Sequence, residues 1–178
     1  MSDPETATHE NSNRPLLWGR FSTVVLVLTL IGVALDQATK LWVLHGSGIP
    51  QNGPIPALPI LDFVLVWNRG ISYGLFQQNS DLGRWLLAGA TVVITVGLWI
   101  WSARCQSKLL AVALGFVIAG AIGNGIDRLA YGAVVDFVYF HVGTFSWYVF
   151  NLADVWIVAG VACLLYDSFA NGPNSAAK

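Results

Sequence analysis

Two aspartates, Asp136 and Asp154, lie eighteen residues apart in surroundings that are almost entirely apolar. Asp136 follows two valines and precedes Phe137, and Asp154 lies within the apolar residues 150–158, where Asn151 is its one strongly polar companion. A carboxylate in the hydrocarbon of a bilayer costs about 2.5–3.5 kcal/mol on insertion scales. Packing gives no reason for two such groups, so we interpret both as candidate functional residues.

Paired carboxyl groups suggest a specific chemistry. Two carboxylates that come close together where the dielectric constant is low cannot both ionise easily, so one holds a proton and the other stays charged. The two then titrate as a unit. Such a pair can hydrolyse an amide, because one group takes a proton from water while its partner protonates the departing nitrogen. The residues alone leave a second interpretation open, in which both aspartates are helix caps at a wet interface.

The composition indicates a membrane protein. The chain has 178 residues, of which 55% are hydrophobic and 11% are charged, whereas soluble domains carry about 25% charged residues. The net charge is −1 and no basic stripe is present, so we expect no nucleic-acid partner. The three histidines are scattered along the chain and no metal-ligand spacing is found, so we expect neither a metal nor an organic cofactor.

Four hydrophobic stretches predict four membrane spans, at about residues 20–44, 84–101, 109–128 and 152–170. Each is close to the ~20 residues that a helix needs to cross ~30 Å of hydrocarbon. An even number of spans places both termini on the same side of the membrane. Basic residues favour the cytoplasm for that side by five to four. The five are Arg14, Arg20, Arg104, Lys108 and Lys178, and the four opposite are Lys40, Arg69, Arg84 and Arg128.

The predicted fold is therefore an integral membrane, mainly α, four-transmembrane-helix bundle. Residues 20–170 form a single membrane catalytic domain between two cytoplasmic tails, a disordered one at 1–19 and a short one at 171–178. Residues 45–83 and 129–151 are the extracytoplasmic segments. They contain strand-like stretches at 61–67 and 134–140, followed by turn signals. Because irregular backbone cannot face lipid, we expect these segments to form a small β-sheet cap outside the bundle.

Polar residues of three predicted spans fall at one membrane depth. Asp36 lies fifteen residues from the inner start of the first span, and Asn124 lies fifteen residues from that of the third. Asp154 lies thirteen residues from the inner end of the fourth. At 1.5 Å per residue, all three are roughly 20 Å from the inner face. Because scattered polar residues would not share a level, we predict one site in the outer third of the membrane.

Further polar residues have helical spacing. Asp36 and Lys40 are four residues apart, so they lie on one helix face and can form an ion pair. Asn124 and Arg128 have the same spacing, with Asp127 between them, and could order carboxylates through charge-assisted hydrogen bonds. On the residues alone, a helix-end ion pair explains the first group equally well, while a helix cap is the less favoured explanation of the second.

Asn68 and Gly70 lie just before the second span in an Asn-x-Gly sequence, which by itself usually marks a turn. The third span carries Gly115, Gly120, Gly123 and Gly125, and small residues in a span let neighbouring helices approach closely. We interpret these glycines as structural.

Taken in order, the polar motifs resemble those of the bacterial lipoprotein signal peptidases (signal peptidase II). Each motif is weak alone, but five in this order within a four-span protein are highly specific. The motifs are Asp36-Gln37-x-Thr39-Lys40, Asn68-x-Gly70, Gly123-Asn124-x-x-Asp127-Arg128, Val134-Val135-Asp136-Phe137 and Phe150-Asn151-x-Ala153-Asp154. The chain differs from many members at residues 71–74, where Ile-Ser-Tyr-Gly follows the Asn-x-Gly motif.

The resemblance implies an intramembrane aspartyl endopeptidase of the bacterial cytoplasmic (inner) membrane. Such an enzyme removes the signal peptide from prolipoproteins by cutting before a cysteine that bears a diacylglyceryl group, and its active site lies near the outer, periplasmic face. Its partners would be these substrates and membrane lipid, and we expect a monomer sensitive to the antibiotic globomycin. Asp136 and Asp154 match the catalytic dyad. The residues that match its supporting positions are Asp36, Lys40, Asn68, Gly70, Asn124, Asp127, Arg128 and Asn151.

Two other classes remain as alternatives. A proton-coupled transporter or channel subunit also places ionisable residues inside the membrane, but its polar residues would be spread over the full depth. No pair of proline-interrupted half-helices indicates a midplane binding site. A scaffold protein would not need paired carboxylates.

Overall fold

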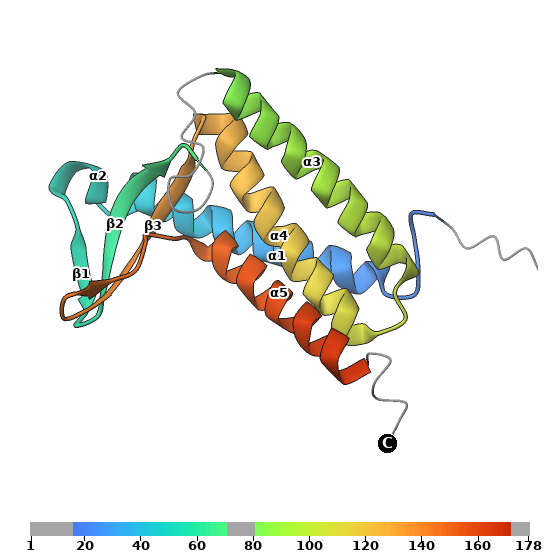
Figure 1. Cartoon of the computed structure of the whole chain (residues 1–178). Helices are drawn as coiled ribbons and strands as arrows, with labels where there is room; N and C mark the ends of the chain where they lie inside the picture. The colour runs from blue at the N-terminus through green and yellow to red at the C-terminus, as the bar shows by residue number, and fades with distance from the viewer. Residues whose placement is uncertain (1–15, 71–80, 172–178) are drawn as a thin grey trace, which may run out of the picture.

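The computed structural model describes residues 16–70 and 81–171. Within these ranges, four helices are long and apolar enough to cross a membrane, which confirms the predicted fold class. They are α1 (Ser22–Leu41), α3 (Asp81–Arg104), α4 (Lys108–Tyr131) and α5 (Leu152–Asn171) (Figure 1). The departure at residues 71–74 and most of the two predicted tails lie outside the described residues.

The observed helices differ from the predicted spans mainly at their ends, and capping explains these limits. The helix α4 begins after Ser107, whose hydroxyl oxygen accepts a hydrogen bond from the Leu110 N–H. It continues three residues beyond the predicted end at 128, until Gly132 takes a left-handed conformation (φ 74°) and its N–H bonds to the Arg128 carbonyl. At the end of α1 the chain continues as a short π-helix, η1 (Trp42–Gly46), and then a four-residue helix, α2 (Ile49–Asn52).

A four-stranded antiparallel sheet lies at one end of the bundle (Figure 1). Its strands, in spatial order, are β1 (Ile55–Leu58), β2 (Leu61–Asn68), β3 (Val134–Val142) and β4 (Phe145–Ser146). The two central strands are paired so that Val66 lies opposite Asp136 and Asn68 lies opposite Val134. The first four residues of β3 are buried, so this register carries Asp136 into the junction between sheet and helices.

The central helix is α4, which packs against α1, α3 and α5 and lies between α3 and α5 in Figure 1. Glycines permit this close packing, as the sequence predicts. A methyl group at Gly120 would collide with the Ala153 carbonyl, and one at Gly123 would collide with the Asp36 carboxylate. These contacts bring the polar residues of α1 and the start of α5 against the same stretch of α4.

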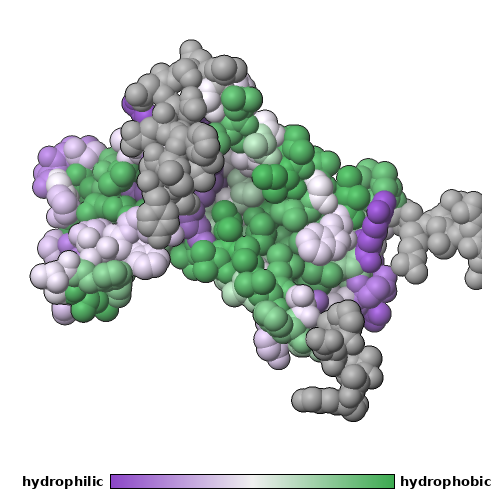
Figure 2. Space-filling model, viewed as in Figure 1, coloured by the Kyte–Doolittle hydropathy of each residue, from purple (hydrophilic) through white to green (hydrophobic). Residues whose placement is uncertain are grey.

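The outer surface of the bundle is apolar. Figure 2 shows hydrophobic residues over the helices and hydrophilic ones mainly at the two ends. Large aliphatic and aromatic side chains stand exposed on α3 and α5, with Val93 72% and Phe169 84% exposed. Surfaces of this kind are stable in lipid rather than in water, so the chain is an integral membrane protein.

Candidate active site

A buried ion triad joins α1 to α4. The Lys40 Nζ lies 2.8 Å from the Asp36 Oδ2 and 2.8 Å from the Asp127 Oδ2. The three side chains are at most 2% exposed. The Gln37 amide joins the same group by donating hydrogen bonds to Asp127 (3.1 Å) and Asp36 (3.2 Å). Sequence reasoning predicted the Asp36–Lys40 pair but missed the role of Gln37, although the residue stands inside the motif.

The triad also holds the backbone next to each candidate catalytic aspartate. The Ala153 N–H donates to the Asp36 Oδ1 at 2.9 Å, and Ala153 immediately precedes Asp154. The Val135 N–H donates to the Asp127 Oδ2 at 3.1 Å, and Val135 immediately precedes Asp136. The ends of two separate elements, β3 and α5, are thus anchored on the same three charges.

Asp154 lies in the first turn of α5, where it forms a reciprocal cap with Asn151. The Asp154 N–H donates to the Asn151 Oδ1 (3.1 Å), and the Asn151 N–H donates to the Asp154 Oδ2 (3.2 Å). This is the capping-box arrangement, with asparagine at the cap and aspartate three residues later. The helix start therefore fixes the orientation of the Asp154 side chain.

Two asparagine amides connect the triad to both aspartates. The Asn124 Oδ1 accepts from the Lys40 Nζ and the Asn151 Nδ2, each at 3.1 Å. The Asn124 Nδ2 donates to the Asp154 Oδ1 at 3.0 Å. The Asn151 Nδ2 also donates to the Asp136 Oδ1, at 2.7 Å. Asn151 is completely buried and contacts both aspartates.

Asp136 is held in the sheet by a second amide. The Asn68 Nδ2 donates to the Asp136 Oδ2 at 2.9 Å, while the Asn68 Oδ1 accepts from the Gly70 N–H at 3.0 Å. The Asn-x-Gly turn therefore fixes the orientation of the amide. Asp136 is only 3% exposed. Burial, followed by the negative charge of Asp154, raises the pKa of Asp136 from 3.8 to about 7.

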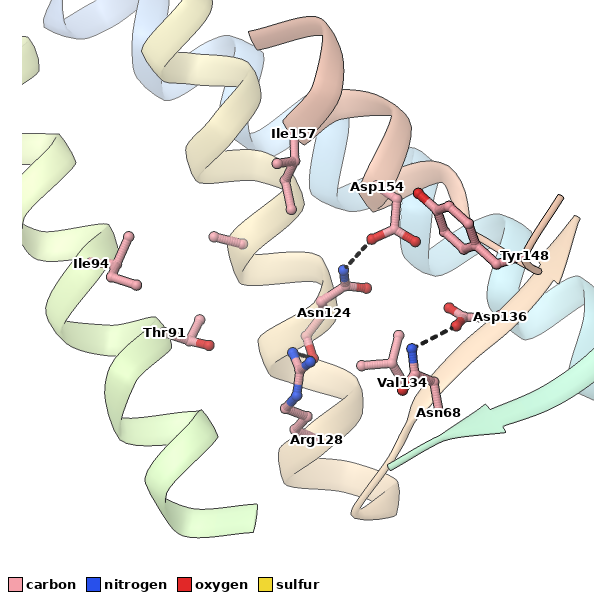
Figure 3. Close-up of a pocket in the computed structure, with 11 residues that line it drawn as sticks. Asn68, Thr91, Ile94, Asn124, Arg128, Val134, Asp136, Tyr148, Asp154 and Ile157 are labelled. Carbon is pink, nitrogen blue, oxygen red and sulfur yellow. Dashed lines mark hydrogen bonds between the residues drawn. The ribbon is translucent and has the colours of Figure 1, made fainter. Parts of the chain in front are cut away.

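A cavity of about 300 Å³ opens in front of the two aspartates. Figure 3 shows their carboxyl groups turned toward a common space, with Arg128 below them. Arg128 donates at 3.4 Å to the carbonyl oxygens of Gly70 and Asn124. The opposite wall is mostly apolar and includes Ile94 of α3. The cavity thus joins a polar surface, which carries both aspartates, to the lipid-facing side of the bundle.

The structure brings all ten predicted site residues into one connected network, which includes the three residues that the depth argument placed at one level. These residues differ in where they lie relative to the cavity. Asp36, Lys40 and Asp127 lie behind the cavity rather than in its wall. Tyr148 and Thr91 line the cavity, and sequence reasoning did not select them, because neither belongs to a polar motif.

Comparison with known proteins decides the family. Residues 28–170 match the family profile described as signal peptidase (SPase) II. The chain belongs to the signal peptidase II family. A relative called lipoprotein signal peptidase in Methylorubrum extorquens (strain PA1) is 53% identical over 150 residues, which cover 84% of this chain and 88% of the relative. One of the same name in Rhodopseudomonas palustris (strain TIE-1) is 51% identical over 152 residues, covering 83% and 93%.

Solved structures share the fold of this signal peptidase. A bacterial membrane enzyme determined by the in meso method at 2.3 Å resolution superposes with a TM-score of 0.76 and 23% identity, covering 88% of this chain and 94% of the other. A second, determined at 1.9 Å resolution, gives a TM-score of 0.71 with 24% identity, covering 84% and 95%. The bundle with its sheet cap is thus an arrangement known from membrane enzymes.

Family membership settles the choice among the three classes considered from sequence. The chain is an aspartic peptidase of the signal peptidase II type, and the transporter and scaffold interpretations are wrong. The resemblance built on five short motifs is confirmed.

Proposed function

We propose that Asp136 and Asp154 are the catalytic dyad of an endopeptidase that removes the signal peptide from diacylglyceryl-modified prolipoproteins, cutting before the lipid-modified cysteine. The observation that carries the proposal is that the two carboxyl groups are bound by the same residue and face the same cavity. Asn151 contacts both aspartates, and both line a single cavity. The relatives named lipoprotein signal peptidase support the substrate class.

The geometry supports hydrolysis by water with no covalent enzyme intermediate. A water molecule between the carboxyl groups loses a proton to one of them as it attacks the scissile carbonyl carbon. The other carboxyl group donates a proton to the carbonyl oxygen. The dyad is held before substrate arrives by three side-chain amides, those of Asn68, Asn124 and Asn151, and by the cap at α5. Little reorganisation is therefore needed in the transition state.

The remaining groups have supporting roles in this proposal. The ion triad of Asp36, Lys40 and Asp127 positions the dyad through backbone N–H groups and does not touch substrate. Arg128 supplies positive charge at the cavity wall for the peptide carbonyl groups. The apolar wall formed by α3 accepts the signal helix or the acyl chains from the bilayer.

We place the enzyme in the bacterial cytoplasmic membrane, with both termini in the cytoplasm and the dyad near the outer face. The sheet lies at one end of the bundle, and the start of α1 and the end of α5 lie near the other (Figure 1). A site near the outer face reaches a substrate whose mature part has already been exported. One chain supplies every group named above, which supports a monomer.

The test is cleavage of a prolipoprotein peptide by the purified enzyme in lipid bicelles, with and without the diacylglyceryl group on the cysteine. Asp136→Asn and Asp154→Asn should each abolish cleavage, and globomycin should inhibit the wild type. Asp62→Asn is the matched control, because Asp62 is a partly exposed aspartate of the sheet that pairs with His141. Turnover in either dyad variant would disprove the assignment, and equal cleavage of the unlipidated peptide would disprove the substrate class.

A further inference from the structure

The two aspartates of the proposed dyad are held by different kinds of partner. Asp154 accepts a hydrogen bond from the Asn151 backbone N–H in the first turn of α5, where the helix dipole places a partial positive charge. Asp136 lies in a strand, and both of its oxygens accept from neutral side-chain amides, those of Asn68 and Asn151.

Charged groups add to this difference. Asn124 stands between Lys40 and Asp154, with its carbonyl oxygen toward the ammonium and its N–H toward the carboxylate. The amide dipole is therefore oriented to stabilise a negative charge on Asp154.

Asp136 is also the more buried of the two, at 3% exposure, while Asp154 is partly exposed to the cavity. The charged groups around Asp136 are Lys40 from α1, Arg128 and Asp127 from α4, and Asp154 from α5. Burial and the Asp154 charge together raise the pKa of Asp136 to about 7.

We propose that the resting dyad carries its proton on Asp136, and that Asp154 is the carboxylate that takes a proton from the attacking water. This division of roles deepens the proposed function and rests on it. Asp136 is then the general acid of the first step, and Asp154 is the general base.

The protons balance over one turnover. As the water oxygen bonds to the carbonyl carbon, a water proton moves to Asp154 and the Asp136 proton moves to the carbonyl oxygen, which gives a neutral gem-diol. The C–N bond then breaks. The Asp154 proton goes to the departing nitrogen, and a hydroxyl proton of the gem-diol returns to Asp136. The products are a carboxylic acid and an amine, and the dyad regains its resting state.

Infrared spectroscopy of the purified enzyme between pH 5 and pH 9 tests this proposal, because a protonated carboxyl group has its own C=O stretch. In the wild type a carboxylic-acid band should disappear with a midpoint near pH 7. Asp136→Asn should remove this band. Asp154→Asn should keep it with a lower midpoint, since the neighbouring negative charge is gone, and Asp62→Asn should leave it unchanged.

The assignment would be overturned if the carboxylic-acid band survived in Asp136→Asn and vanished in Asp154→Asn. It would also be overturned if the band were lost equally in both variants, because a proton shared by the two aspartates would give that result. If either of these spectra is found while neither variant cleaves substrate, only the division of roles between the two aspartates is refuted. Cleavage retained by either variant instead refutes the dyad itself.

A second measurement does not need the dyad variants to fold. Asn68 donates a hydrogen bond to Asp136 and has no described bond to Asp154. Asn68→Ala should therefore destabilise the ionised form of Asp136 alone and raise the pKa of Asp136. The alkaline limb of the pH profile of kcat/KM should then move to higher pH while the acidic limb stays in place. Movement of the acidic limb alone would mean that Asp136 is the base.

Discussion

The Lys40 ammonium lies 2.8 Å from the Asp127 carboxylate, although the two residues are far apart in sequence and both are completely buried. With Asp36 at the same distance, two carboxylates share one cation in the interior of the bundle. Burying these charges is unfavourable by itself. The arrangement makes sense as a support, because each carboxylate also binds the backbone N–H that precedes one of the dyad aspartates.

Lys40→Met should therefore be among the most destabilising substitutions of the membrane domain. The methionine fills a similar volume but leaves two carboxylates buried without their cation, a change that typically costs about 3–5 kcal/mol. Thermal unfolding in detergent measures the loss. Adding Asp36→Asn and Asp127→Asn should recover much of it, because the amide oxygens can still accept the two backbone bonds. A Lys40→Met protein as stable as the wild type would show that the triad has no supporting role.

The glycine contacts on α4 give a second prediction, with a matched control on α3. Gly120→Ala should lower the unfolding temperature by several degrees, because the added methyl group would meet the Ala153 carbonyl and push α5 away. Gly97→Ala on α3 meets nothing within 4 Å. It should be neutral or slightly stabilising, since alanine favours a helix over glycine by about 1 kcal/mol. Equal effects of the two substitutions would contradict the close packing of α4 and α5.

Asn151→Ser separates the two roles of Asn151. Serine keeps a side-chain oxygen at the helix cap, so the unfolding temperature should change little. It cannot supply the 2.7 Å amide bond to Asp136. Hydrogen bonds to charged groups contribute about 1.5–3 kcal/mol, so kcat should fall by about 10- to 100-fold. Unchanged kcat would mean that the bridge between the two aspartates is dispensable.

Much of this site could be predicted from sequence because the helices are regular. Residue counts along three spans placed Asp36, Asn124 and Asp154 at one depth. In the structure Lys40 joins Asp36 to Asn124, and Asn124 binds Asp154 directly. The Asp36–Lys40 pair followed from its spacing alone. Both results depend on a constant rise and a constant turn per residue, so they needed no knowledge of how the helices pack.

Contacts between elements could not be predicted in the same way. Gln37 lies next to Asp36 in sequence, and adjacent residues on a helix point in different directions, yet its long side chain reaches Asp127 across the gap to α4. The register of β2 on β3, which brings Asn68 to Asp136, depends on a bulge between Phe63 and Val66. Neither feature has a periodic signal in the sequence.

The raised pKa of Asp136 makes a final prediction about stability and pH. Because the folded protein holds the proton to about pH 7 and an unfolded aspartate releases it near 3.8, protonated Asp136 favours the folded state. This contribution is complete below about pH 4 and is lost as the pH rises through 7. Between pH 5 and pH 8 the loss amounts to about 2–3 kcal/mol.

Asp136→Asn replaces the protonated carboxyl group with a neutral amide of the same shape, so the variant should escape this loss. Its unfolding temperature should fall less than that of the wild type between pH 5 and pH 8, and the two proteins should differ most at the alkaline end. Every other titrating group is present in both proteins, so the difference between the two curves reports the ionisation of Asp136 together with its coupling to Asp154. Parallel curves would mean that Asp136 ionises freely in the folded enzyme, which is incompatible with an acid that must hold its proton until substrate arrives.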